Sequence, residues 1–169
     1  IKKYIFTAQM KIAMTSGDTW FEVAAEVNNC RSDCDTSPPY IEGSIALIPG
    51  ELWQPFPSLG LVFDSIEGSI RVQTSSHALN SWYTQEAYIT ASSTTQFTIV
   101  PGLTMQNVFV EAEFTRPSCE GYTVKCPDPI WSWAIGGTIT MAVGDEGFTL
   151  TIKASQDSEG NWSFTGEYD

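Results

Sequence analysis

The chain has few basic residues. Lys and Arg total 8 against 20 Asp and Glu, which gives a formal net charge of −12. This charge repels phosphate backbones and anionic lipid surfaces, so neither nucleic acid nor an anionic membrane is an expected partner. Long hydrophobic runs are also lacking, and no stretch approaches the roughly 20 apolar residues that a membrane-spanning helix needs. The composition favours cations or uncharged partners such as sugars.

The residues of common active sites are sparse. His77 is the single histidine and no G-x-S-x-G motif is present, so neither a serine triad nor zinc or copper held by imidazoles is expected. The acidic turns at 145–146 and 157–161 do not have EF-hand spacing, and Asp, Asn and Gly are ordinary residues of hairpin turns. We expect no metal, no cofactor and no catalytic residue, and the sequence leans against an enzyme.

Cysteine is limited to four residues, spaced C-x3-C and C-x6-C rather than in the C-x2-C pattern of structural zinc sites. We predict two local disulfides, Cys30–Cys34 and Cys119–Cys126, each around a turn. A crossed pairing that ties the two loops together is the alternative. The even cysteine count and the scarcity of lysine favour a secreted, extracellular protein. A first residue of Ile1 rather than Met fits a processed form or an excised domain.

Aromatic residues and a regular alternation are what the chain does have. Its 169 residues include six Trp, six Tyr and nine Phe, which is enough for one domain, 1–169, with a sizeable core. A period of two predicts strands with one buried face and one wet face, paired in antiparallel sheets. The segments that alternate most clearly are 1–14, 20–28, 107–114, 147–155 and 161–168.

These patterns predict an all-β, single-domain antiparallel β-sandwich, jelly-roll-like, of about ten strands, with a closed β-barrel as the alternative. Further strands are expected at 41–49, 60–66, 69–75, 82–91, 94–100 and 135–143. Turn residues separate them, including Gly and Asp at 66–68, 101–102, 144–147 and 157–161. By alternation, the core should include Phe21, Phe148, Trp162 and Phe164.

Three irregular segments, 30–40, 50–59 and 115–131, are rich in proline or aromatic residues, and loops of this kind often carry sites. Trp131 and Trp133 share a face of one strand, whereas Trp82 and Tyr83 occupy both faces of theirs. Flat rings beside amides and carboxylates suit the apolar and hydroxyl faces of a sugar. The sequence therefore predicts a secreted, lectin-like carbohydrate-binding module, whose ligand-binding residues are Trp53, Phe56, Trp82, Tyr83, Trp131 and Trp133.

Two other functions stay open at this point. In the first, a closed barrel binds a small apolar ligand, lined by residues such as Tyr4, Phe6, Met10 and Met14. In the second, a glycoside hydrolase or polysaccharide lyase uses paired carboxylates such as Glu111 and Glu113, with Glu86 nearby. Residues two apart on a strand are about 6.5–7 Å apart, a separation that suits an inverting glycosidase. The oligomeric state is not predicted.

Overall fold

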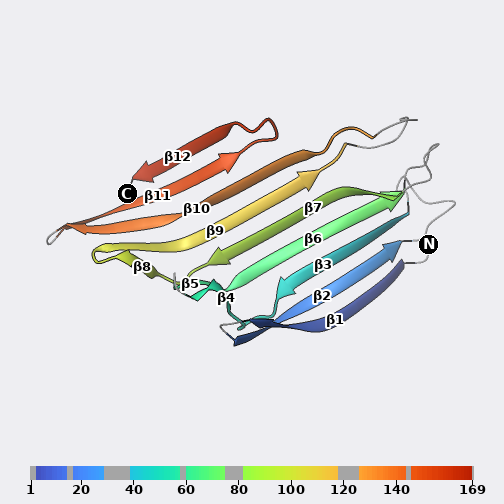
Figure 1. Cartoon of the computed structure of the whole chain (residues 1–169), viewed down its shortest axis with the longest axis horizontal. Helices are drawn as coiled ribbons and strands as arrows, with labels where there is room; N and C mark the ends of the chain where they lie inside the picture. Colours follow the sequence, from blue (N-terminus) through green and yellow to red (C-terminus); the bar gives the residue numbers. More distant parts are fainter. Residues whose placement is uncertain are drawn as a thin grey trace.

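The computed structural model describes residues 3–14, 17–28, 39–57, 60–74, 82–117, 126–143 and 146–168. In these residues the fold is one long antiparallel sheet with a small second sheet (Figure 1). In spatial order, the long sheet consists of β1 (Lys3–Met14), β2 (Gly17–Asn28), β3 (Tyr40–Leu47), β6 (Ser65–Thr74), β7 (Trp82–Ser93), β9 (Leu103–Thr115), β10 (Ile130–Val143), β11 (Glu146–Gln156) and β12 (Trp162–Tyr168). The short strand β8 (Phe97–Val100) pairs with β9 beside this path, and β4 (Trp53–Phe56) pairs with β5 (Leu61–Phe63).

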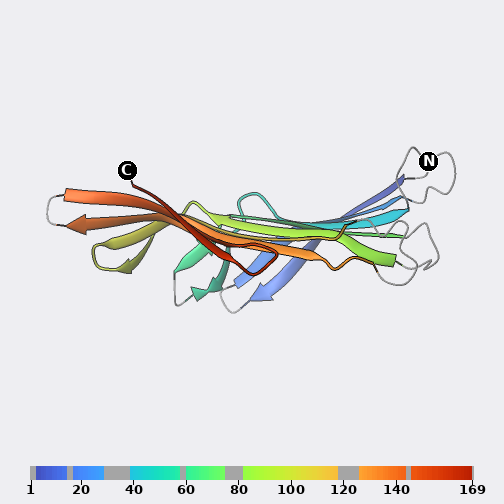
Figure 2. The ribbon, with the colours of Figure 1, turned by 90° about the horizontal axis from the view of Figure 1, so that it is seen from above.

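The prediction of an all-β antiparallel fold is confirmed. The long sheet has ten strands, β1 and β12 form its two edges, and the described residues contain no α-helix. The sheet is not closed, so the alternative of a closed barrel is wrong. Seen from its edge, the long sheet is a thin twisted layer, and β4 and β5 lie on one side of it (Figure 2). The β4–β5 pair supplies part of a second layer, which is consistent with a β-sandwich.

The pairing register divides the long sheet into two chemically different faces. Side chains alternate between faces along a strand, and residues paired across strands share a face. The register places Glu22, Glu42, Arg71, Glu111 and Lys153 on one side, which we call the charged face. Every other Asp, Glu, Lys or Arg of this sheet whose side chain the structure describes also falls there. The opposite side, the apolar face, carries mainly aliphatic and aromatic residues.

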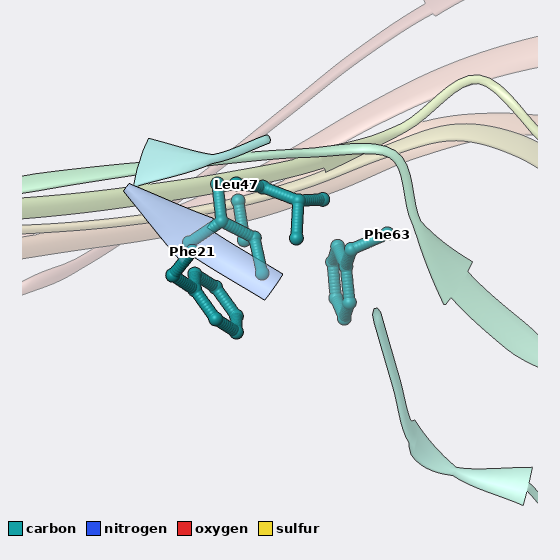
Figure 3. Close-up of a cluster of buried hydrophobic side chains, with 5 residues drawn as sticks. Phe21, Leu47 and Phe63 are labelled. Atoms are coloured by element: carbon teal, nitrogen blue, oxygen red, sulfur yellow. The ribbon is translucent and has the colours of Figure 1, made fainter. Parts of the chain in front are cut away.

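The buried core lies on the apolar face, under β4 and β5. Phe21 and Leu47 from the long sheet pack with Phe63 of β5 (Figure 3), and Ile66 and Ala91 complete the buried cluster. The ring centroids of Trp53 and Phe63 are 5.6 Å apart, which ties β4 to the same cluster. Burial of each large side chain contributes on the order of 1.5–3 kcal/mol. The small sheet therefore stabilises one end of the apolar face and leaves the rest open.

Only one of the four predicted core residues is buried, and Phe148 is buried only in part. Phe21 is buried, as the alternation predicts, but 76% of Phe164 is exposed to solvent and Trp162 is about half exposed. Alternation correctly places both on the apolar face. The prediction of burial is wrong because β12 is an edge strand and β4–β5 does not reach it.

One predicted turn is also wrong, and another is confirmed. Gly68 was expected in a turn at 66–68, but it lies inside the continuous strand β6. A Cβ at Gly68 would lie 3.0 Å from the carbonyl oxygen of Tyr88, so the glycine permits close approach of β7 rather than a change of direction. The turn at 157–161 does connect β11 and β12, and Gly160 adopts a φ of 83°. The expected turn at 144–147 lies partly outside the described residues.

Candidate functional site

A groove crosses the charged face between β7 and β12. Its volume is about 660 Å³, and we call it the polar groove. Two rows of paired residues line it: Tyr88–Glu113–Ser132, and Thr90–Glu111–Ala134–Ser155–Ser163. The row between them, from Ile89 to Trp162, also borders the groove, but its side chains lie on the apolar face by alternation. The groove therefore opens on the charged face.

Small side chains form the floor of the polar groove. Ser132 and Ala134 of β10 lie beside Ser155 of β11, and Ser155 Oγ is 2.8 Å from Oγ of Ser163 on β12. Because none of these side chains extends far from the sheet, the centre of the face is hollow. Longer side chains, among them Tyr88, rise around it. The Tyr88 ring is half exposed and can contact a molecule lying in the groove.

Charges of both signs meet in the groove. Lys153 Nζ lies 3.9 Å from Oε2 of Glu111, and both side chains are about half exposed. The exposed Glu113 lies two residues from Glu111 on the same face of β9. At such exposure an ion pair contributes little to stability, so these groups are available to a ligand.

A second hollow of about 200 Å³ adjoins the polar groove and shares Tyr88 and Glu113 with it. It runs toward β3 and is bordered by Glu42, Ser69 and Glu86. The two hollows together cross the strands from β3 to β12, a distance of roughly 30 Å at about 4.8 Å between strands. This length suits an extended ligand.

The turn at the open end of the groove is held by Asp157. Its Oδ1 accepts hydrogen bonds from the backbone N–H groups of Glu159 and Asn161, each at 2.9 Å. These bonds lower the pKa of Asp157, with Asn161 making the largest contribution. Asn161 Nδ2 also donates to Asp157 Oδ2 at 3.2 Å. The acidic residues of this turn thus have the hydrogen-bonding role that turn chemistry predicts.

A separate polar cluster lies on the charged face near the N-terminal edge. Glu26 Oε2 is 2.8 Å from Lys3 Nζ, and Glu26 also accepts a hydrogen bond from the Tyr40 hydroxyl. These two bonds, that from Lys3 first, lower the pKa of Glu26, and the bond to Glu26 raises the pKa of Lys3 and of Tyr40. The guanidinium of Arg71 lies 3.9 Å from the centroid of the Tyr40 ring. This cluster fastens β1, β2, β3 and β6 together.

The structure gathers part of the predicted aromatic set on the apolar face. Trp131 and Trp133 share that face of β10, as predicted. Trp131 meets the Phe114 ring edge-on at 4.7 Å, and Trp133 meets Trp162 at 4.4 Å. Trp133 Nε1 donates a 2.6 Å hydrogen bond to Oε1 of Gln156. These rings form an aromatic cluster on the side of the sheet opposite the polar groove.

The other predicted aromatic residues lie elsewhere. Trp53 packs in the core cluster with Phe63. Trp82 is half exposed, whereas Tyr83 is buried and its hydroxyl accepts a 2.5 Å hydrogen bond from Gln73. This confirms that the two neighbours on β7 face opposite sides. Phe56 belongs to β4, and its side chain lies outside the described residues. The six predicted residues are thus not brought together in one pocket.

Sequence reasoning missed most of the groove. Tyr88, Ser132, Ser155, Ser163, Lys153 and Asn161 were not predicted as ligand-binding residues, although Glu111 and Glu113 were considered as a carboxylate pair. The local signal for them is weak, because alternating Ser, Thr and Tyr residues are ordinary on the wet face of a strand. Only the register between non-consecutive strands, such as β7 with β9, places them side by side.

Several sequence predictions fall outside the described residues. Cys30, Cys34 and Cys119 are among them, so both disulfides stay predictions, and so does any role of His77. In the described ranges, no group of three or more His, Cys, Asp or Glu could hold a metal ion. The same ranges contain no helix that is long and apolar enough to cross a membrane.

Comparisons with known proteins give no further guidance: no protein-family model, no curated protein and no solved structure matches the chain.

Proposed function

We propose that this protein is a carbohydrate-binding module that holds a neutral oligosaccharide in the polar groove. The observation that carries the proposal is the groove itself, an open hollow of about 660 Å³ whose lining combines hydroxyls, carboxylates, an amide and an exposed tyrosine ring. Its extension past Tyr88 and Glu113 favours a ligand of more than one sugar unit.

The lining matches the two kinds of surface that a sugar presents. The C–H patches of a sugar ring pack on an aromatic face, which Tyr88 offers. Sugar hydroxyls both donate and accept hydrogen bonds, and they find acceptors in Glu111 and Glu113 and donors in Lys153 and Ser132. The net charge of −12 disfavours anionic ligands, so an uncharged sugar is the better match.

This proposal keeps the predicted class of ligand but gives the main aromatic contact to Tyr88. The predicted binding residues Trp131 and Trp133 lie on the other face of the sheet, away from the carboxylates of the groove. Secretion and the two disulfides are part of the proposal as expectations from composition and cysteine spacing.

Carboxylate-based cleavage of a glycan is the second candidate, because Glu111 and Glu113 both line the polar groove. A general acid has to keep its proton near neutral pH, and active sites achieve this by burying the carboxyl or placing it near another negative group. Both glutamates are exposed to solvent. We therefore favour binding, and we expect no new reducing ends when the protein is incubated with an oligosaccharide that it binds.

The proposal is tested by a glycan array followed by calorimetric titration of the neutral oligosaccharides that bind. Tyr88→Ala should weaken binding about five- to tenfold, the loss expected for one aromatic contact. Tyr4→Ala is a matched control, because Tyr4 is 49% and Tyr88 47% exposed, but Tyr4 lies on the apolar face. No binding of any neutral glycan, or an equal loss in both variants, would overturn the proposal.

A further inference from the structure

The apolar face of the long sheet is covered only in part. Along the strands, its residues form successive rows that run across the sheet. The core cluster under β4–β5 lies mainly in the one row that contains Phe21, Leu47, Ile66 and Ala91. Three rows lie beyond it, and their exposed residues are Tyr4, Phe6, Ile41, Ile70, Ile89, Trp131 and Trp162. The hydrophobic face of a sheet is stable only when another layer covers it.

We propose that a second copy of this chain covers these three rows, so that two long sheets pack face to face with the charged faces outward. The three rows lie two residues, or about 6.8 Å, apart and cross nine, seven and five strands. At about 4.8 Å between strands they span roughly 20 Å by 34 Å on average. This area of roughly 700 Å² is close to the roughly 800 Å² that each partner buries in a standard protein interface. The proposal is independent of the proposed function, since the polar groove stays on the outside.

The distribution of charge permits a second copy. Two chains that each carry −12 repel one another, and a random encounter would bring like charges together. The register removes this difficulty, because the described strands of the long sheet place no charged residue on these three rows. A face-to-face pair keeps the negative charges of both copies in water.

The apolar face has a hollow that complements its aromatic cluster. The hollow, of about 310 Å³, is bordered by Gly43, Gly68, Ile45, Ile70 and Ile89. It exists because glycines occupy neighbouring rows of β3 and β6, where any side chain would fill the space. The aromatic residues Trp131 and Trp133 protrude from β10 in the same two rows.

Two-fold symmetry brings the hollow and the aromatic cluster together. β7 is the middle strand of the nine-strand path, and β3 and β10 each lie two strands from it on opposite sides. A two-fold axis parallel to β7 therefore places β10 of one copy over β3 of the other, and the reverse. Trp131 and Gly43 lie in one row, so Trp131 of each copy faces the glycine hollow of the other.

Sedimentation velocity of the whole chain from 1 to 100 μM tests the interface. We expect a dimer, and we expect Phe6→Glu and Trp131→Glu to raise its dissociation constant at least tenfold. Ile5→Glu and Ile130→Glu are matched controls: Ile5 is 63% exposed against 61% for Phe6, and Ile130 47% against 59% for Trp131, but both isoleucines lie on the charged face. Circular dichroism identifies any variant that fails to fold. If one does, the test rests on the other apolar-face variant and its matched control.

Three results would overturn the interface. The wild-type chain could be a monomer throughout this range, or it could be a dimer that both apolar-face variants leave intact. It could also float as a monomer with neutral phosphatidylcholine vesicles, in which case a lipid surface rather than a second copy covers the face.

Discussion

Lys153 Nζ lies 3.9 Å from Oε2 of Glu111, across the β10 strand that separates their own strands β11 and β9. This pair places one positive charge in a groove that also holds Glu111 and Glu113. A neutral sugar can therefore hydrogen-bond to charged groups of both signs without making a net ionic contact. Hydrogen bonds to charged groups are stronger than those between neutral groups, which compensates for the openness of the groove.

The first prediction concerns salt. Because the proposed ligand is uncharged, its affinity should change less than twofold between 50 and 500 mM NaCl, since salt screens only interactions between charges. An oligosaccharide of the same length with uronate units should bind more weakly at low salt, because the protein carries −12. Calorimetric titrations at the two salt concentrations measure both effects. An affinity that rises steeply as salt is removed would show that the groove selects charged ligands.

The second prediction concerns acid stability. Hydrogen bonds from Lys3 and Tyr40 lower the pKa of Glu26 in the folded chain below its ordinary value of 4.5. A lowered carboxyl pKa stabilises the fold above pH 4.5, and this stability is lost as the pH falls through the folded value. The urea concentration at the midpoint of unfolding should therefore decrease as the pH is lowered below 4.5. Glu26→Gln should make this decrease shallower.

Glu22→Gln is the matched control for this change, because Glu22 is an exposed residue on the same face of β2. The raised pKa values of Lys3 and Tyr40 have the opposite consequence at high pH. Their contribution is complete below about pH 10 and is lost as the pH rises through their folded values. A wild-type chain and a Glu26→Gln variant with parallel urea midpoints from pH 3 to 6 would contradict the assigned role of Glu26.

The third prediction concerns Gly136 in β10. A Cβ there would lie 2.5 Å from the carbonyl oxygen of Ile152 and 2.6 Å from two ring carbons of Phe109. Gly136→Ala should therefore lower the free energy of unfolding by about 1–3 kcal/mol, the usual cost of overpacking. Gly147→Ala is the control, since its Cβ would meet only the Met141 carbonyl oxygen, at 3.5 Å. If urea titrations give equal free energies of unfolding for the two variants, the Phe109 ring moves aside with no loss of stability.

The strands of this protein could be predicted from its sequence, whereas the shape of the layers could not. Alternation in WFEVAAEVN correctly placed Phe21 on one face of β2 and Glu22 on the other. The same alternation placed Trp162 on the correct face but could not show whether a second layer covers it. That coverage depends on where β4–β5 packs, which no local pattern specifies.

The candidate site could likewise be predicted only in part. Glu111 and Glu113 were recognised as a pair because residues two apart on a strand share a face. Tyr88 and Ser132 join them only through the registers of β7 with β9 and of β9 with β10. Gly68 was misread as a turn residue because glycine permits both turns and close strand contacts, and only the position of the Tyr88 carbonyl distinguishes the two.

The most direct test of the central claim is a map of backbone amide chemical shifts during titration with a neutral oligosaccharide selected on the glycan array. The account predicts that the shifted amides cluster around the polar groove, at Tyr88, Glu113, Ser132, Ser155 and Ser163. Shifts centred instead on Trp131, Ile70 and the other exposed residues of the apolar face would contradict it.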